Sequence, residues 1–278
     1  MRGAPEQYSI NQTNFKFREQ NAVYRGKVRD VYDIGDQLII IATDRISAFD
    51  HILPRPIPFK GQVLNQVAAH FLQAVQDICP VWLESCPDPN VSVGKKCQAI
   101  PIEMVVRGYL AGHAWRIYKN GGRSLCGVSL EEGMVENQKL PTAIITPTTK
   151  AAEGHDQDVS MDEILELGLV SKEILDTMSN LALALYRRGS EMAAEQGLIL
   201  VDTKYEFGLY EDHVMLMDEV HTPDSSRYFE MKSYAQRLAK GEPQIQLSKE
   251  FVREWLMAHG FEGKVGQIMP EMPDTFVW

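Results

Sequence analysis

The segment LVDTKYEFG, residues 200–208, alternates charged and mostly apolar positions with a period of two. Asp202, Lys204 and Glu206 occupy every second position. Because successive side chains of a β-strand point to opposite faces, this pattern predicts a strand with a charged stripe on one face. A half-solvated strand whose charges face water would show the same alternation.

The flanking segments favour a functional interpretation of the stripe. Residues 173–197 repeat apolar positions at helical spacing and predict a long helix. HVMLMDEV, residues 213–220, predicts a second strand that follows a turn at 211–212 and ends in Asp218 and Glu219. Carboxylates therefore gather at one end of two strands, where like charges repel unless a cation or substrate lies between them. A divalent metal is the simplest remedy.

The remaining pattern predicts a β-rich first lobe and a mixed α/β second lobe, with a ligand cleft between them. In the first half of the chain we expect a hairpin within residues 23–45 with a turn at 34–36, an extended proline-containing loop at 50–61, and an amphipathic helix at 61–76 with Val63 on its apolar face. Strands around 100–106, a short helix and a long loop at 121–159 are expected next. A capping box at Ser160 and Glu163 should start a short helix ending at Gly168, and an amphipathic helix is expected at 248–260. Lys27 and Arg29 are two positions apart on the first hairpin and are expected to share a face.

Composition excludes several classes of protein. The 278 residues are 44% hydrophobic and 24% charged, and the formal net charge is −10, which argues against a broad nucleic-acid surface. No apolar run is long enough for a membrane span and no signal peptide is evident, so we expect a cytoplasmic, soluble protein. The cysteines show neither metal-site nor disulfide spacing, so free thiols are expected at Cys79, Cys86, Cys97 and Cys126.

Five segments, taken together and in order, resemble the SAICAR synthetase (phosphoribosylaminoimidazole-succinocarboxamide synthase) family of purine biosynthesis. They are GKVRDVY at 26–32, TDRISAFD at 43–50, EMVVRGYLAGHAW at 103–115, LILVDTKYEFG at 198–208 and DEVHTPDSSRY at 218–228. TPTTKAAEGHDQDVS at 146–160 resembles the longer-chain branch of that family.

The resemblance implies an α+β fold of two lobes, related to ATP-grasp and protein-kinase-like nucleotide-binding folds. The expected lobes are residues 1–104, which cover ATP, and residues 105–278, which hold Mg²⁺ and substrate. The implied enzyme is an ATP-dependent carboxylate–amine ligase that joins L-aspartate to a phosphoribosyl-aminoimidazole carboxylate, giving SAICAR, ADP and phosphate on the route to IMP. Such chemistry requires the carboxylate to accept the γ-phosphoryl group first, because a free carboxylate is a poor acylating agent, and it depends on positioning and charge neutralisation.

The resemblance also implies roles for individual residues. Glu206 and Asp218 match the acidic positions that hold Mg²⁺, and Asp202 and Lys204 match positions at the reacting centre. The expected ATP contacts are Lys27, Arg29, Glu103 and Glu206, and the expected contacts of the imidazole nucleotide are Arg107, His113, Asp224, Ser226 and Arg227. Small molecules are the only partners implied, and a monomer and a homo-oligomer both remain open.

Simpler interpretations stay open at several of these positions. Lys27 and Arg29 would also suit a solvated hairpin face. His113 stands where the family commonly has serine, and it could equally point to solvent at a helix start. Asp50, Lys60, Lys150 and His155 could contact ligands or could lie in loops without a catalytic role.

Three rival functions were weighed against the family resemblance. A protein kinase requires a G-x-G-x-x-G loop, an H-R-D catalytic loop and D-F-G, none of which occurs in the sequence. A different carboxylate–amine ligase would keep the Mg²⁺ carboxylates but not the nucleotide-binding arginines. A catalytically inactive scaffold would be favoured by loss of Lys27, Glu206 or Asp218, and all three are present.

Overall fold

The computed structural model describes residues 4–150 and 157–278, and the chain forms two compact units. Unit 1 comprises Met1–Leu72, Trp82–Lys96 and Lys249–Trp278, and unit 2 comprises Gln73–Val81 and Cys97–Ser248. The expected boundary between residues 104 and 105 differs from this division. It falls inside one continuous strand, and the C-terminal segment groups with the N-terminal unit.

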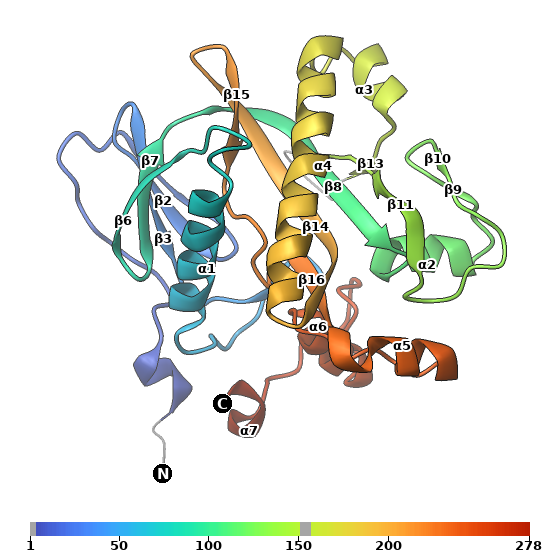
Figure 1. Cartoon of the computed structure of the whole chain (residues 1–278). Helices are drawn as coiled ribbons and strands as arrows, with labels where there is room; N and C mark the ends of the chain where they lie inside the picture. The colour runs from blue at the N-terminus through green and yellow to red at the C-terminus, as the bar shows by residue number, and fades with distance from the viewer. Residues whose placement is uncertain (1–3, 151–156) are drawn as a thin grey trace. The chain divides into compact units, whose positions relative to one another are not determined.

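Unit 1 contains a five-stranded antiparallel sheet (Figure 1). Its strands, in spatial order, are β1 (Ala22–Arg25), β2 (Arg29–Asp33), β3 (Gln37–Ala42), β7 (Val91–Lys95) and β6 (Leu83–Asp88). The predicted hairpin is confirmed as β2 and β3. The expectation that Lys27 and Arg29 share a strand face was wrong, because an additional strand, β1, pairs with β2 and places Lys27 in the bend between them.

The helices of unit 1 bury apolar side chains from both ends of the chain. They are η1 (Pro5–Tyr8), α1 (Lys60–Ala74, which runs on into unit 2), α6 (Glu250–Ala258) and α7 (Asp274–Val277), and two short strands, β4 (Ser47–Ala48) and β5 (His51–Ile52), accompany them. Val252 and Leu256 of α6 pack in one cluster with Ile46 and Leu53. The predicted helices at 61–76 and 248–260 are confirmed, although Val63 is 52% exposed rather than buried.

Unit 2 is organised by two long antiparallel strands, β8 (Gln98–Tyr109) and β14 (Leu198–Tyr210). The other strands of this seven-stranded sheet are β11 (Lys139–Ile145), β12 (Thr148–Thr149), β13 (Gln157–Asp158), β15 (His213–Met217) and β16 (Ser226–Glu230). The predicted strands at 200–208 and 213–217 are confirmed. Glu211 and Asp212 have φ of 49° and 62°, as a two-residue hairpin turn requires.

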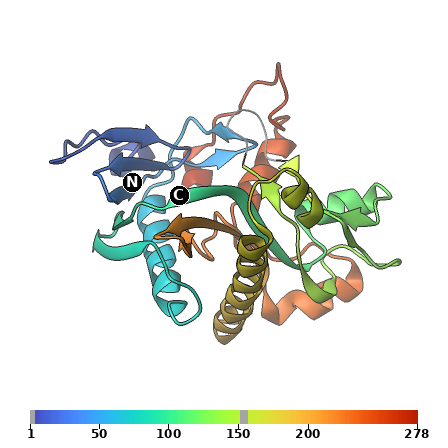
Figure 2. The same cartoon turned by 90° about the horizontal axis from the view of Figure 1, so that it is seen from above.

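The helices of unit 2 are α2 (Gly112–Lys119), α3 (Met161–Glu166), α4 (Lys172–Glu195) and α5 (Met231–Lys240). Helix α4 packs on one face of β8 and β14 (Figures 1 and 2). The capping box at Ser160 is confirmed, because both of its hydrogen bonds with Glu163 form. Helix α5 was not predicted, although Met231, Tyr234 and Leu238 recur at helical spacing in the sequence.

The expected loop at 121–159 was wrong in part. It contains β11, which pairs with the end of β8, as well as the short strands β9 (Ser124–Leu125) and β10 (Val128–Ser129). Pro141 lies in β11 where the pairing register shifts between Lys139 and Ile144, so the tertiary pairing tolerates a residue that usually argues against a strand. His155 lies outside the described residues.

Across residues 4–150 and 157–278, no helix has the length and apolar character needed to cross a lipid bilayer. The four cysteines are free thiols, as predicted.

Candidate active site

The charged stripe of β14 is a buried feature of unit 2. Asp202 and Glu206 are each 7% exposed, so the interpretation of the stripe as a solvated strand face was wrong. The alternate residue Tyr205 is fully buried, lies near Tyr186 of α4 and bonds to His221. The stripe therefore projects from the sheet face opposite to α4.

A cluster of acids and lysines occupies one end of the stripe. The register of β8 and β14 places Glu103 directly opposite Glu206. The Lys204 ammonium bridges the two carboxylates, at 2.6 Å from Glu103 Oε1 and 3.0 Å from Glu206 Oε1. Lys150 Nζ lies 2.5 Å from Glu206 Oε2, and the Thr148 hydroxyl donates to Glu103 Oε2 at 3.3 Å.

These pairings keep the buried groups charged. Burial alone would raise the pKa of Glu206, but the adjacent Lys204 and Lys150 outweigh burial and lower that pKa. Burial would likewise lower the pKa of Lys204, yet Glu206 and Glu103 reverse the direction and raise it. The pKa of Lys150 is raised for the same reason, because Glu206 overcomes the burial penalty. The Glu206 carboxylate can thus remain ionised at neutral pH although it is buried.

Asp218 joins this cluster from β15. It follows Met217, which pairs with Glu206 in the sheet, and its φ is 57°. Its negative charge contributes to the raised pKa values of Lys204 and Lys150, which places it near both ammonium groups.

The donors at this end suit Mg²⁺ held jointly with phosphate. No group of three or more His, Cys, Asp or Glu side chains suited to holding a metal occurs in the described part of the chain. Mg²⁺, however, is commonly bound by one or two carboxylates together with water and substrate phosphates. Glu206 and Asp218 offer two carboxylates, so they fit such a shared site and not a cage made of protein alone.

A second cluster, of arginines, occupies the other end of the stripe. The Asp202 carboxylate lies between Arg107 of β8 and Arg227 of β16, with Oδ2 at 3.2 Å and 2.6 Å from their Nη1 atoms. Arg107 Nε also donates to the Thr146 hydroxyl at 2.8 Å. Burial lowers the pKa of Arg107 and Asp202 offsets this in part, but a guanidinium remains charged at neutral pH.

The start of α2 lies against the arginine cluster. Gly112 has φ of 54°, and a Cβ at this position would lie 2.2 Å from Arg227 Nη1, so only glycine allows the guanidinium to approach so closely. His113, the next residue, bonds through Nε2 to Asp158 Oδ2 at 2.6 Å. The His113 side chain is 41% exposed, and its contact with the nucleotide stays a prediction.

Not all of the predicted residues join the two clusters. Asp224 and Ser225 donate their backbone N–H groups to the Thr222 hydroxyl, which shapes the loop before β16. The Ser226 hydroxyl lies 2.7 Å from Thr203 Oγ1, and both residues are buried, so this hydroxyl faces away from the stripe.

Lys27 and Arg29 belong to unit 1. Lys27 is half-exposed and forms an ion pair with Asp50, and Arg29 begins β2. Their predicted contacts with ATP stay predictions.

Thr146, Thr148 and Asp158 contact the clusters but were not among the predicted site residues. They fall in the segment taken for a loop, and it is the pairing of β11 and β12 with β8 that brings the threonines to Arg107 and Glu103. The run TPTTK was the available signal. Lys150 is the last residue of this run. Its predicted role was either a ligand contact or a loop residue, and its ammonium group pairs with Glu206.

Comparison with known proteins agrees with the geometry. The sequence model of the SAICAR synthetase family matches residues 22–268. A phosphoribosylaminoimidazole-succinocarboxamide synthase from Bacteroides thetaiotaomicron is 59% identical over 271 residues, which cover 97% of this chain and 86% of that protein. A chloroplastic synthase from Vigna aconitifolia is 48% identical over 258 residues, 91% of this chain and 75% of that protein.

A solved structure gives the same result. The SAICAR synthase from Saccharomyces cerevisiae, in a complex with SAICAR, has a TM-score of 0.82 and 33% sequence identity, and the match covers 97% of this chain and 93% of the yeast chain. The predicted α+β fold is therefore confirmed.

The fold and these matches define an ATP-dependent carboxylate–amine ligase of purine biosynthesis. The chain belongs to the SAICAR synthetase family. The predicted reaction, which joins L-aspartate to the imidazole carboxylate with ATP, is confirmed, and the kinase and inactive-scaffold interpretations are excluded.

Glu206→Gln should destabilise the protein in a pH-dependent way. At neutral pH, loss of the carboxylate leaves two ammonium groups under-paired, and the free energy of unfolding should fall by about 1–3 kcal/mol. Because the pKa of Glu206 is lowered in the folded state, this difference should be largest above the unfolded-state pKa of roughly 4.3 and should shrink as the pH falls below it.

Urea unfolding at a series of pH values measures the effect. Glu166→Gln, at an exposed glutamate of α3, is the matched control and should show no such dependence. An equal difference at every pH would contradict the pairing of Glu206 with the lysines.

Proposed function

We propose that the two clusters on the β14 stripe are the active site at which the imidazole carboxylate is phosphorylated by ATP and then attacked by L-aspartate. The observation that carries the proposal is the division of charge along one strand face. At one end Lys204 and Lys150 face Glu103, Glu206 and Asp218, a net charge of −1. At the other end two arginines pair with the carboxylate of Asp202, and the carboxylate of Asp158 is paired with His113.

This division favours different ligands at the two ends. The acidic end attracts a divalent cation, and Glu206 and Asp218 are the carboxylates that would hold Mg²⁺ on the ATP phosphates. When bound, Mg²⁺ would neutralise charge on the transferring phosphoryl group. The arginine end attracts an anion, and the substrate carries both a carboxylate and a phosphate.

Arg227 is well placed to bind the substrate phosphate. Its guanidinium lies against Gly112 at the start of α2, so a phosphate there would meet both a cation and the N-terminal end of a helix. Arg107, His113 and the loop at Asp224 and Ser226 are proposed to complete the nucleotide site, Ser226 by positioning the neighbouring Arg227 and not through its hydroxyl.

Lys204 and Asp202 are proposed to act on the reacting carboxylate. They are two residues apart on one strand face, so a carboxylate bound by Arg107 would lie beside the Lys204 ammonium. Lys204 would offset the negative charge that builds up as the phosphoryl group is transferred, and Asp202 would hold both arginines in position.

Further contacts come from residues outside the stripe. Glu103, Lys27 and Arg29 are proposed to bind ATP together with Glu206. We propose that unit 1 contributes to ATP binding and that unit 2 holds Mg²⁺ and substrate. We also propose that the protein works in the cytoplasm as a monomer or homo-oligomer with small molecules as its only partners, in line with its net charge of −10.

Asp218→Asn should leave a folded enzyme that has lost most turnover, because a neutral amide is a much weaker ligand for Mg²⁺ than a carboxylate. We expect kcat to fall by roughly a hundredfold at saturating Mg²⁺, measured by ADP release. Asp212→Asn, in the exposed β14–β15 turn, is the control and should keep normal turnover. Near-normal activity of Asp218→Asn, with an unchanged thermal midpoint, would remove Asp218 from the metal site.

Arg227→Lys should raise the KM for the imidazole nucleotide by about tenfold and leave the KM for ATP almost unchanged. Lysine cannot reproduce the planar, two-point contact of a guanidinium with phosphate. Steady-state kinetics with each substrate varied in turn give both constants, and Arg237→Lys on α5 serves as the control. Equal rises in both constants would mean that Arg227 does not contact the nucleotide selectively.

A heavy-oxygen label in the substrate carboxylate tests the order of the reaction. If the γ-phosphoryl group is transferred to this carboxylate before aspartate attacks, one labelled oxygen leaves with phosphorus and should be found in the released phosphate. Mass spectrometry of that phosphate is the measurement. Unlabelled phosphate, with product formed normally, would overturn the acyl-phosphate route and favour activation of another group.

A further inference from the structure

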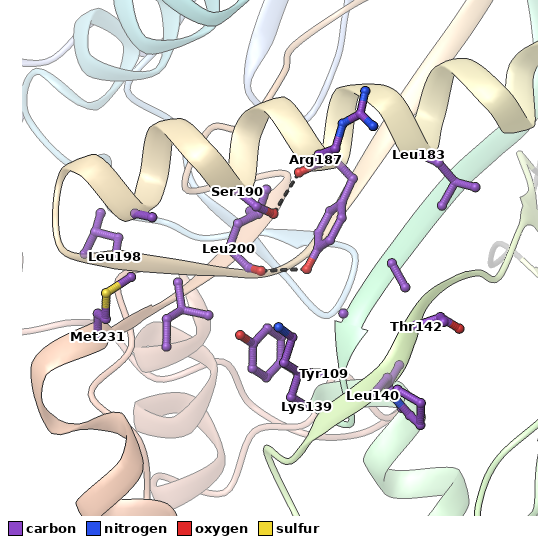
Figure 3. A pocket seen from close by; sticks show the side chains of 16 residues that line it. Tyr109, Lys139, Leu140, Thr142, Leu183, Arg187, Ser190, Leu198, Leu200 and Met231 are labelled. Carbon is purple, nitrogen blue, oxygen red and sulfur yellow. Dashed lines mark hydrogen bonds between the residues drawn. The ribbon is translucent and has the colours of Figure 1, made fainter.

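Unit 2 contains a cavity that involves none of the residues of the charged stripe. Its volume is about 450 Å³, and it lies among α4, the end of β8, β11 and the first residues of β14 (Figure 3). This volume is within the range of sites for small organic ligands, which are mostly apolar with a few polar groups. Of the sixteen residues that line it, none is acidic, and Lys139 and Arg187 are the two that carry charge.

Two side-chain hydrogen-bond donors line this cavity, those of Tyr109 and of the exposed Lys139. Tyr109 and Lys139 are directly opposite each other in the pairing of β8 and β11. Within residues 4–150 and 157–278, neither the Tyr109 hydroxyl nor the Lys139 ammonium makes a hydrogen bond or an ion pair. Burial raises the pKa of Tyr109, so its hydroxyl keeps its proton and remains a donor at neutral pH.

Two neighbouring hydroxyl groups already have acceptors. The Tyr186 hydroxyl donates to the Leu200 carbonyl oxygen at 2.7 Å, and the Ser190 hydroxyl donates to the Tyr186 carbonyl oxygen at 2.7 Å (Figure 3). The Arg187 guanidinium points away from the Tyr109 ring in the same view. Tyr109, Lys139 and the Thr142 hydroxyl therefore remain to bind an acceptor, and the acceptor that suits a cation together with neutral donors is an anionic oxygen.

The rest of the lining suits a flat apolar body. Leu183, Leu198 and Ile199 contribute aliphatic surface, and the Tyr109 ring already packs edge-on against two aromatic rings. An anionic group alone would leave this surface without a partner, whereas an aromatic ring that carries the anion would cover it.

We propose that this cavity is a second binding site, which takes a small aromatic anion whose charged group is bound by Lys139 and Tyr109. The site is separate from the reaction centre in its lining residues. A ligand in this cavity would nevertheless contact β8, which also carries Arg107. Gly108, in the cavity wall, is the residue between Arg107 and Tyr109.

Anilinonaphthalene sulfonate is a suitable probe, because it combines two aromatic groups with one sulfonate and fluoresces when bound. The titration is made on the full chain with saturating ADP, Mg²⁺ and SAICAR, so that the active site is blocked. We expect one saturable site in the unmodified protein. Lys139→Gln should weaken binding about tenfold and Tyr109→Phe about threefold, since each removes one hydrogen bond to the anion.

Three controls make the result specific. Lys119→Gln removes an equally exposed lysine of unit 2 and should leave the affinity unchanged. Phenylnaphthylamine, the uncharged analogue, should bind weakly and without any dependence on Lys139. Ala194→Trp places a large ring in the cavity wall and should abolish binding of both probes.

Several outcomes would overturn the proposal. Equal affinity in Lys139→Gln and Lys119→Gln would show that the anion is not held at Lys139. Complete displacement of the probe by the active-site ligands would place it at the reaction centre. If probe binding is lost as the protein concentration is raised, and sedimentation shows a dimer, a second copy of the chain covers this surface. None of these results depends on turnover, so they leave the proposed function to its own tests.

Discussion

The antiparallel pairing of β8 with β14 is the constraint on which the candidate site depends. Its register sets Arg107 opposite Asp202 and Glu103 opposite Glu206, while Lys204 lies opposite Val105 between these two pairs. A shift by one residue would turn every side chain of β14 to the opposite face, toward α4. The apolar packing of Tyr205 and Val201 on that other face therefore holds the register that the charges need. Stability and chemistry are built into alternate residues of the same strands.

The site also shows why buried charge persists here. Replacing a buried ion-pair network with well-packed apolar residues is often neutral or stabilising, so Glu103, Lys204 and Glu206 are not needed to hold the sheet together. The pKa of Lys204 is raised and that of Glu206 is lowered, so these two groups keep each other charged. A network with this property keeps fixed charges where water is scarce, and fixed charges of that kind are what phosphoryl transfer requires.

Much of the fold could be predicted from local sequence, and the elements that were missed differ in the reason. The long strands, α4 and the capping box of α3 follow from alternation, helical period and an N-cap, which are all local signals. β11 and the threonines of TPTTK could not be found this way, because they are ordered by pairing with β8, a partner some forty residues away in the chain. Helix α5 buries no residue, yet Met231, Tyr234 and Leu238 recur at helical spacing, so its signal was present in the sequence. The predicted boundary at 104 and 105 lies within the continuous strand β8.

The candidate site was predictable as a set of residues but not as an arrangement. Motifs marked Arg107, Asp202, Glu206 and Arg227, yet they did not show that one carboxylate serves two arginines or that Lys204 bridges two glutamates. Ser226 is the clearest case, since a motif cannot tell which face of β16 receives its hydroxyl. That face is decided by the pairing of β16 with β14, which brings Ser226 to Thr203 and leaves Arg227 beside Asp202. Ser226 and Arg227 are adjacent in one motif but have different roles, because successive side chains of a strand point in opposite directions. Ser226 packs in the core of the sheet, and Arg227 lies at the candidate site.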